Sequence, residues 1–340
     1  PAIYDSHDWA GRKRGQPFFM QVQLNGGKLR EGPEAARVKF REHVVSELGA
    51  VTDPSKVTLP PYYPRDPVLL QDWADYLDAV RLTDLHVGRV IARLEKEGQL
   101  ANTLVVFMTD HGISHARGKQ FLYEEGAHVP LVIRGPGVPV GQVRPDLVEH
   151  IDLAALSLSA ANLGVPTWMQ GKDILATNYA AREEAFSARD RCDETTEKIR
   201  SLRTDKFIYI RNYHPERPHL QPCAYKDGKQ IVQQLRTLHA AGKLSQLSEK
   251  LLFSPTRPRE ELYELAADRW QVRNLAEDPA YAAVLAEHRQ RLDAKLVATK
   301  DPAPESMAMY DSDMKPYVGK GSPVIEGNIA QMKKWASEGK

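Results

Sequence analysis

The chain has 340 residues, 42% hydrophobic and 27% charged, which is typical of a globular protein with room for one large domain and a smaller one. Its 46 basic and 45 acidic residues leave a net charge of +1, so the composition predicts neither a nucleic-acid binder nor a polybasic membrane protein. Any anion must therefore be bound by a local cluster. No apolar run approaches the roughly 18 to 20 residues that span a bilayer.

The N-terminal part of the chain predicts a strand, a helix and a loop. Pro17–Leu24 alternates in part and is followed by Asn25-Gly26-Gly27, which predicts a strand that ends in a turn. Val38–Leu48 is compatible with a helix, and the proline-rich stretch Leu59–Pro67 predicts a loop of the kind that often borders binding sites.

Residues 71–98 predict a long helix, because apolar residues recur every three or four positions and Gly98 supplies a stop. Asp84 falls on the same stripe, so we expect it to be buried and to anchor structure through a hydrogen-bonding partner. The stripe is formed by Trp73, Leu77, Val80, Val87, Ile91 and Leu94.

The next elements alternate between strand and helix. Asn102–Thr109 is a continuous apolar run, which predicts a strand buried on both faces of a parallel sheet. Leu131–Arg134 predicts a short strand before the turn 135–137, and Leu147–Leu163 predicts a helix. This order indicates a layered α/β domain, to which we assign residues 1–185.

A smaller α+β subdomain is expected over residues 186–300. Ile199–Tyr213 mixes β-branched, aromatic and basic residues, which predicts a strand pair in an antiparallel sheet. Residues 229–251 and 279–298 predict helices, and residues 301–340 predict a polar tail that wraps over the surface.

Cys192 and Cys223 are the only cysteines of the sequence. They are too few for a disulfide scaffold and lack the Cys-x-x-Cys spacing of zinc sites. We expect two free thiols, and the alternative is one disulfide in an oxidising compartment.

Asp110-His111-Gly112 directly follows the predicted buried strand, at the sheet edge where open α/β sheets bind ligands. A carboxylate and an imidazole on adjacent residues, in a turn freed by Gly112, can face one divalent cation. The alternative is an ordinary turn at the end of a strand, which the same three residue types also suit.

The following loop is dense in groups that bind anions, which favours a tetrahedral oxyanion as its guest. A lysine offers such an anion a compact positive charge, and an imidazole can donate a hydrogen bond or move a proton. The alternative is a solvated polar loop. The polar side chains are His115, Arg117, Lys119, Tyr123, Glu124, Glu125 and His128.

Three stretches resemble the formylglycine-dependent sulfatases of the alkaline-phosphatase-like superfamily. Residues 76–137 carry Tyr-Leu-Asp-Ala-Val-Arg, Thr-Asp-His-Gly and Gly-Lys-Gln-Phe-Leu-Tyr-Glu-Glu-Gly, and residues 199–213 and 261–275 resemble that family's C-terminal subdomain. The resemblance covers roughly residues 17–300 and implies part of an alkaline-phosphatase-like layered α/β domain with a C-terminal subdomain.

The resemblance also implies roles for single residues. Asp110 and His111 match two ligands of a divalent metal, usually calcium, and Lys119 matches a lysine that contacts the sulfate group. His115 matches a histidine near that lysine in part of the family, which implies a catalytic role.

The chain departs from the family pattern at two further positions. Where a histidine often follows the strand equivalent to residues 18–24, this chain has Lys28 nearby, so we expect Lys28 to take the anion-facing place. His128 stands where an arginine is commoner, and we assign it to substrate binding with Lys28.

The family's nucleophile is absent from the sequence. It lies in a Cys/Ser-x-Pro-x-Arg motif whose first residue is oxidised to formylglycine, and Ser254-Pro-Thr-Arg-Pro258 does not match because its proline comes one place early. The chain opens at Pro1 without Met or an apolar signal core, so we expect an upstream segment that carries this motif and the paired aspartates of the metal site. We therefore expect the chain alone to be inactive, and either an exposed apolar patch beside residues 18–24 and 104–108 or a bound partner there, such as the missing N-terminal portion.

The implied function is hydrolysis of sulfate esters, with sulfamates as a less favoured substrate, in a sulfated carbohydrate or glycosaminoglycan. One alternative is a phosphodiester or phosphonate monoester hydrolase of the same superfamily, because a metal with a nearby lysine also suits phosphoryl transfer. Another is a non-catalytic remnant, either structural or one that binds sulfated glycans. The resemblance favours a periplasmic or secreted protein.

Overall fold

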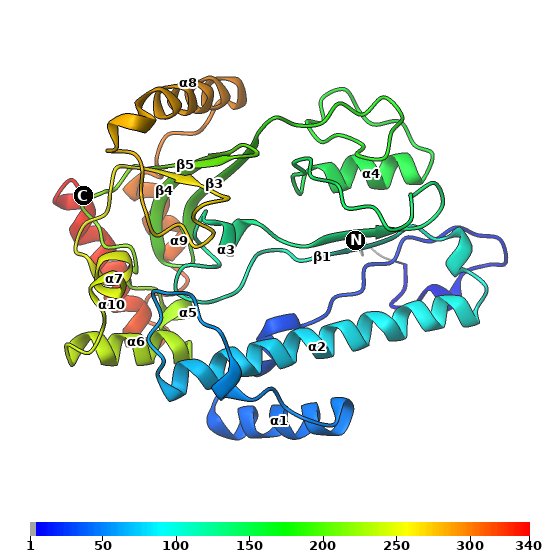
Figure 1. Ribbon diagram of the computed structural model, residues 1–340, viewed down its shortest axis with the longest axis horizontal. Coiled ribbons are helices and arrows are strands. Elements are labelled where there is room, and N and C mark those ends of the chain that lie inside the picture. Colours follow the sequence, from blue (N-terminus) through cyan, green and yellow to red (C-terminus); the bar gives the residue numbers. More distant parts are fainter. Residues whose placement is uncertain (1–4) are drawn as a thin grey trace. The chain divides into compact units, whose positions relative to one another are not determined.

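A computed structural model describes residues 5–340 of the chain (Figure 1). Its contacts divide the chain into two compact units. The first comprises the chain up to Thr52 together with Asp75–Arg93, and the second comprises Asp53–Ala74 and Leu94–Lys340. These units have other bounds than the three regions expected from the sequence, which remain a prediction.

The first unit is built from α1 (Glu34–Leu48) and the middle of α2 (Pro67–Lys96). Helix α1 ends at Gly49, which has a φ of 82° and so takes the left-handed conformation that closes many helices. The two helices bury a small apolar core, which consists of Phe40, Val44, Ala79 and Leu82.

The long helix at residues 71–98 is confirmed by α2, but the buried face was misplaced. Asp84 and Val80 are exposed, whereas Asp78 is fully buried. The Asp78 carboxylate accepts a hydrogen bond from the backbone N–H of Thr52 at 3.0 Å. The expectation that Asp84 is the buried anchor was therefore wrong. The buried face of α2 includes the small residues Ala74 and Ala79 and the polar contact of Asp78. A search for a stripe of large apolar residues detects neither feature.

The strand expected at residues 17–24 is wrong as well. The backbone of residues 16–25 has no strand, and Asn25 is the N-cap residue of the 3-10 helix η2 (Gly26–Arg30). Extended backbone becomes a strand only when a neighbouring strand accepts and donates its hydrogen bonds, and within residues 5–340 this segment belongs to neither of the two sheets. Phe19 is 70% exposed there.

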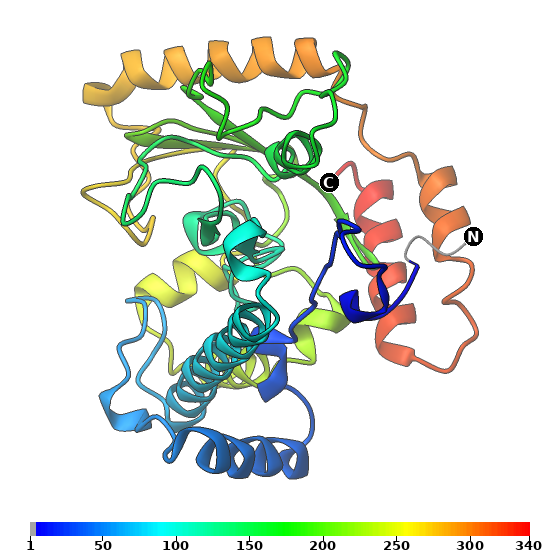
Figure 2. The same ribbon diagram turned by 90° about the vertical axis from the view of Figure 1, so that its right-hand side faces the viewer.

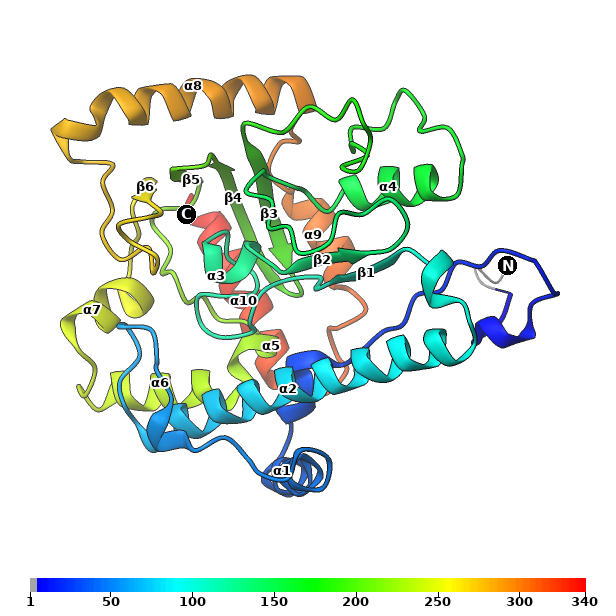
Figure 3. The ribbon, with the colours of Figure 1, turned by 45° about the vertical axis from the view of Figure 1, so that its right-hand side comes forward.

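The second unit contains two sheets, and the smaller one leads to the candidate site. Strands β1 (Val105–Met108) and β2 (Leu131–Arg134) pair antiparallel, with Val105 opposite Arg134 (Figure 3). The expectation of a strand buried in a parallel sheet was wrong, because this two-stranded ribbon leaves alternate side chains exposed. The exposed apolar residues are Val106 and Met108 on one face of the ribbon and Val132 on the other, so the single apolar patch expected beside residues 104–108 remains a prediction.

The larger sheet is antiparallel, with the order β3 (Ala185–Cys192), β4 (Thr195–Arg203), β5 (Phe207–Asn212) and β6 (Glu260–Glu264). The strand pair expected at 199–213 is confirmed by β4 and β5. Alternation of side chains along β5 sends Ile208 and Ile210 to one face and Tyr209 to the other.

Each face of this sheet has its own cover. Phe121, Leu122 and Tyr123 of the candidate loop pack against the Ile208 face. Helix α8 (Ala282–Thr299) packs on the Tyr209 face through Leu285 and Leu292, and it lies above the strands in Figure 2. The loop after β1 thus packs on one face of this sheet.

The remaining helices are short. The helix expected at 229–251 is broken at Gly242, and the helix expected at 147–163 is shorter than predicted. These elements are α3 (Glu124–Ala127), α4 (Asp152–Ala160), α5 (Ala224–Asp227), α6 (Gln230–Ala240), α7 (Gln246–Ser248) and the π-helical turn η5 (Glu249–Phe253). Single turns of 3-10 helix occur at η1 (Trp9–Gly11), η3 (Pro54–Lys56), η4 (Leu100–Asn102) and η6 (Pro279–Tyr281).

The C-terminal segment, expected as a surface tail, contains two helices. It forms α9 (Met307–Met314) and α10 (Pro323–Ser337), which enclose a core of Tyr310, Met314, Ile329 and Met332. These apolar residues recur at helical spacing, and the polar residues between them concealed that pattern.

Candidate active site

Asp110 and His111 follow β1 after one residue, Thr109, and their side chains face each other. Asp110 Oδ2 lies 3.4 Å from His111 Nε2. His111 Nδ1 lies 2.7 Å from its neighbour's carbonyl oxygen, Gly112 O, so it carries the proton and leaves the Nε2 lone pair free to accept. Among the described residues, the buried Nε2 atom has no hydrogen-bond partner.

This geometry fits two ligands of one cation. Metal–ligand distances of about 2.0–2.6 Å place neighbouring ligand atoms near 3 Å apart, close to the separation between these two atoms. The second ring nitrogen is held by a carbonyl, as is usual for ligating histidines. Two ligands make an incomplete site, and within the described residues the one group of three side chains close enough together to hold an ion lies elsewhere, at Asp193, Glu194 and Cys223.

The loop after His111 is closed by main-chain hydrogen bonds. Gly112 N donates to Gly126 O at 2.9 Å, and Lys119 N donates to Ile113 O at 2.7 Å. A Cβ atom on Gly112 would overlap the carbonyl oxygen of Glu125, so only glycine fits there. The second of these hydrogen bonds holds the backbone of Lys119 next to Ile113, two residues after His111.

Lys119 has a defined position and no opposite charge beside it. Its Nζ atom lies 3.4 Å from Tyr225 Oη and 4.5 Å from the centre of the Tyr225 ring. Its side chain is partly exposed, and no carboxylate among residues 5–340 forms an ion pair with it. An ammonium group held on an aromatic ring without a counter-ion is suited to bind an anion.

His115 lies in the core. Its side chain is fully buried, and Nε2 lies 2.8 Å from Asp72 Oδ2. Its carbonyl oxygen accepts a hydrogen bond from Lys226 Nζ, and burial lowers the pKa of Lys226 to about 7. His115 therefore fixes the loop to α2 and α5, and it presents no surface to a substrate.

Arg117 is a second buried anchor of the loop. Its guanidinium donates to Trp270 O at 3.0 Å and to Gln271 O at 2.9 Å, and it stacks over the ring of Tyr123 at 3.9 Å. These contacts tie the loop to the segment after β6.

His128 lies at the rim of a cavity of about 300 Å³. Its Nδ1 atom is 2.7 Å from Glu124 Oε2, and this hydrogen bond raises the pKa of His128. Although burial acts to raise it, the hydrogen bonds from His128 and Arg203 hold the pKa of Glu124 below its usual value. The cavity is lined by Tyr62, Arg117, Tyr123, Glu124, Glu125, His128, Leu265, Arg269, Trp270 and Gln271.

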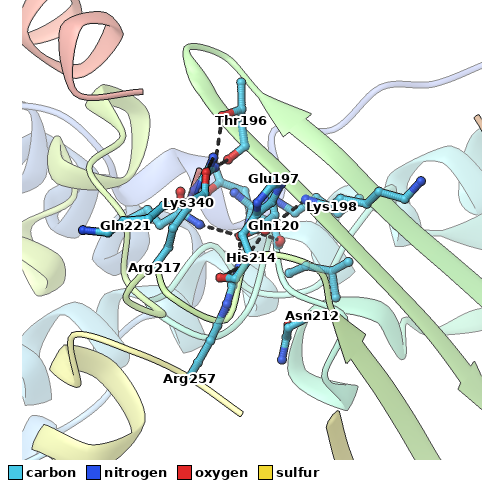
Figure 4. Close-up of polar contacts among 12 residues, drawn as sticks. Gln120, Thr196, Glu197, Lys198, Asn212, His214, Arg217, Gln221, Arg257 and Lys340 are labelled. Carbon is cyan, nitrogen blue, oxygen red and sulfur yellow. Dashed lines mark hydrogen bonds and ion pairs between the residues drawn. The ribbon is translucent and has the colours of Figure 1, made fainter. Parts of the chain in front are cut away.

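A buried charged cluster supports the sheet next to the loop (Figure 4). Arg257 Nη2 lies 2.6 Å from both carboxylate oxygens of Glu197, and Gln221 donates to the same carboxylate. Burial alone would raise the pKa of Glu197, but Arg257 and Arg189 outweigh it and lower that pKa. Arg257 of the rejected Ser254–Pro258 match is thus a structural residue.

Lys28 belongs to the first compact unit, so its predicted place beside the anion remains a prediction. Its side chain is exposed on η2. Sequence reasoning missed Tyr225 and His150. The exposed His150 donates from Nε2 to Thr109 O at 3.0 Å and so lies next to Asp110. Both residues are distant from the loop in sequence, and no local pattern indicates their contacts.

Two family models match the chain. The model described as Sulfatase matches residues 3–163, and the one described as N-sulphoglucosamine sulphohydrolase, C-terminal, matches residues 111–219. An ulvan-active sulfatase of Formosa agariphila is 34% identical over 257 residues, which is 74% of this chain and 43% of that protein. The chain spans about half the length of the curated relatives it matches.

Solved structures show the same fold. A structure described as a 2-O GAG sulfatase is 20% identical with a TM-score of 0.52, covering 85% of this chain and 56% of that one. The phosphonate monoester hydrolase of Silicibacter pomeroyi is 22% identical with a TM-score of 0.50, covering 76% and 49%.

These likenesses show that the chain has an α/β fold of the alkaline-phosphatase-like kind. The chain belongs to the sulfatase family, as the resemblance in residues 76–137 implied, and that family generally uses a metal ion. Within residues 5–340, none of the helices is long and apolar enough to cross a bilayer.

Proposed function

We propose that the protein containing this chain hydrolyses sulfate esters, with a sulfated carbohydrate or glycosaminoglycan as its substrate. Asp110 and His111 would hold a divalent metal, with calcium as the proposed ion, and Lys119 would bind the sulfate. The observation that carries this proposal is the 3.4 Å separation of two metal-binding atoms, with Lys119 returned to the same loop by its hydrogen bond to Ile113 O.

The residues of this chain would bind and orient the substrate. Lys119 would meet an oxygen of the sulfate that gains negative charge as the ester bond breaks. A bound cation would supply Lewis acidity toward the sulfate oxygens. His115 would act as a positioning residue, because it is buried against Asp72 and fixes the loop that carries Lys119.

His128 and the cavity beside it would bind the sugar. Because its pKa is raised by Glu124, His128 carries a positive charge in a larger fraction of molecules than an isolated imidazole. The cavity adds the indole of Trp270 and the guanidinium of Arg269, which lies 4.6 Å above that ring. An aromatic face with nearby cations suits a sulfated sugar.

The nucleophile is proposed to come from outside this sequence. Formylglycine would supply the hydroxyl that attacks sulfur, and no residue here stands in a Cys/Ser-x-Pro-x-Arg motif. We propose that the preceding portion of the protein carries it and covers Val106, Met108 and Val132, which are exposed on the β1–β2 ribbon. An exported protein, periplasmic or secreted, is proposed from the family resemblance, and cell fractionation tests it.

The deciding experiment compares the chain alone with the full-length protein. We expect no turnover of an aryl sulfate by the 340-residue chain with calcium, and turnover by the full-length protein. Turnover by the chain alone would show that an unrecognised nucleophile lies within it. Faster hydrolysis of an aryl phosphonate would favour a phosphonate hydrolase, and calcium binding with no turnover by the full-length protein would favour a non-catalytic glycan binder.

Lys119→Ala tests the sulfate site in the full-length protein. Loss of a preorganised charge should lower kcat by about 10²–10³-fold, as loss of an oxyanion-hole donor does. Lys243→Ala is the matched control, because Lys243 is an exposed lysine outside the loop. Equal rate constants in the two variants would reject the assignment of Lys119.

A further inference from the structure

The two cysteines are held in neighbouring, well-ordered elements. Cys192 is the last residue of β3 and pairs with Thr195 across the two-residue turn Asp193–Glu194. Cys223 directly precedes α5 and is its N-cap residue. Both are free thiols, with Cys223 buried and Cys192 partly exposed.

A single side chain shows that the two sulfur atoms are close. Gln120 Nε2 lies 2.8 Å from Cys192 Sγ and 3.6 Å from Cys223 Sγ. The sulfur atoms therefore lie no farther apart than these two distances combined. Gln120 is fixed in turn, because its carbonyl oxygen accepts a hydrogen bond from Arg189 Nη1 at 2.8 Å, and it lies beside the Glu197 cluster (Figure 4).

The local chemistry gives the two thiols different protonation. A hydrogen bond from Cys192 lowers the pKa of Cys223, outweighing the effect of burial, and the same hydrogen bond raises the pKa of Cys192. Cys223 therefore loses its proton more readily than Cys192, whereas the partly exposed Cys192 is the thiol that a molecule in solution reaches first.

We propose that Cys192 and Cys223 are a modification site, at which a low-molecular-weight disulfide such as oxidised glutathione converts the two thiols into a reversible disulfide. The bond would join the end of β3 to the start of α5. The side chain of Tyr225 in α5 contacts the Nζ atom of Lys119.

The reaction proceeds by two exchanges and needs no other oxidant. The sulfur of Cys192, after its proton is lost, attacks one sulfur of the small disulfide, so that a mixed disulfide forms and one small thiolate leaves. The sulfur of Cys223 then attacks the sulfur of Cys192 and releases the second small thiolate. The two cysteines lose two electrons, the small disulfide gains them, and the two protons end on the two small thiols.

The test is an oxidation series on the purified 340-residue chain. The chain is incubated in glutathione buffers of increasing oxidised fraction, quenched in acid, denatured and alkylated, and then analysed by mass spectrometry. We expect both thiols to be lost together, with a mass decrease of two hydrogen atoms and a cross-linked peptide pair containing Cys192 and Cys223. Dithiothreitol should restore both thiols.

Single variants separate the two steps. In Cys223→Ser, Cys192 should keep a glutathione adduct because the second exchange has no nucleophile. In Cys192→Ser, the buried Cys223 should remain reduced. The wild-type result decides the proposal even if a variant fails to fold. A lasting glutathione adduct on Cys192 with Cys223 free, two thiols that stay reduced, or a disulfide between two chains would each overturn it.

Discussion

Glu197→Gln is the sharpest test of what holds the site's supporting sheet together. The variant keeps the shape of the side chain but removes the charge that faces Arg257. The two side chains are 0% and 4% exposed, with Arg257 Nη2 at 2.6 Å from the carboxylate. Removal of one partner from a buried pair leaves the other charge uncompensated and costs roughly 3–5 kcal/mol.

Glu184→Gln is the matched control, because Glu184 also pairs with an arginine. Glu184 lies 2.9 Å from Arg291, but both side chains are more than a quarter exposed, so its loss should cost about 0–1 kcal/mol. The free energy of unfolding is measured by urea denaturation followed by circular dichroism. If Glu197→Gln destabilises the chain no more than Glu184→Gln, the charge argument is refuted.

The same pair predicts a pH dependence. The pKa of Glu197 is lowered in the folded protein, so its contribution is fully present above the pKa of an unfolded glutamate, about 4.3, and is lost as pH falls through the lower folded value. The stability difference between wild type and Glu197→Gln should therefore shrink in acid. A difference that stays constant down to strongly acidic pH would contradict the assignment.

Two further predictions concern the loop. Gly118→Ala places a methyl group on the carbonyl oxygen of Ile113 and should destabilise the chain by about 1–3 kcal/mol. Gly327→Ala, whose methyl group enters open space on α10, should stabilise the chain by about 0.5–1 kcal/mol. Equal midpoints of urea denaturation for the two variants would contradict this prediction. Glu124→Gln should lower the pKa of His128, because the hydrogen bond that His128 donates to the Glu124 carboxylate raises that pKa. An unchanged histidine titration by NMR would show that the 2.7 Å contact does not persist in solution.

Local sequence was a good guide where an element's partner is its neighbour in sequence. Strands β4 and β5 were predicted because one antiparallel pair lies within residues 199–213. It failed at residues 17–24, where extended backbone needs a hydrogen-bonding partner from elsewhere. It also failed at Asp84, because the buried acidic residue of this part of α2 is Asp78, which accepts a hydrogen bond from Thr52.

The contacts of the candidate site also could be predicted only where the residues are close in sequence. The proximity of Asp110 and His111 could be predicted because the two are adjacent after a strand. The contact between Tyr225 and Lys119 could not be predicted, because the two residues are more than a hundred positions apart and meet only when α5 packs on the loop. The burial of His115 against Asp72 was hidden for the same reason.

The main-chain closure of the loop between Gly112 and Gly126 has a consequence for how this site can change over evolution. The hydrogen bonds at Gly112 and Lys119 join backbone atoms, so the path of the loop does not depend on the side chains at its exposed positions. His128 or Lys119 can then be replaced without refolding the loop. Single substitutions at exposed positions can therefore change the substrate preference of such a site. Gly112 and Gly126 cannot be replaced as easily, because a Cβ atom there would overlap a main-chain carbonyl oxygen.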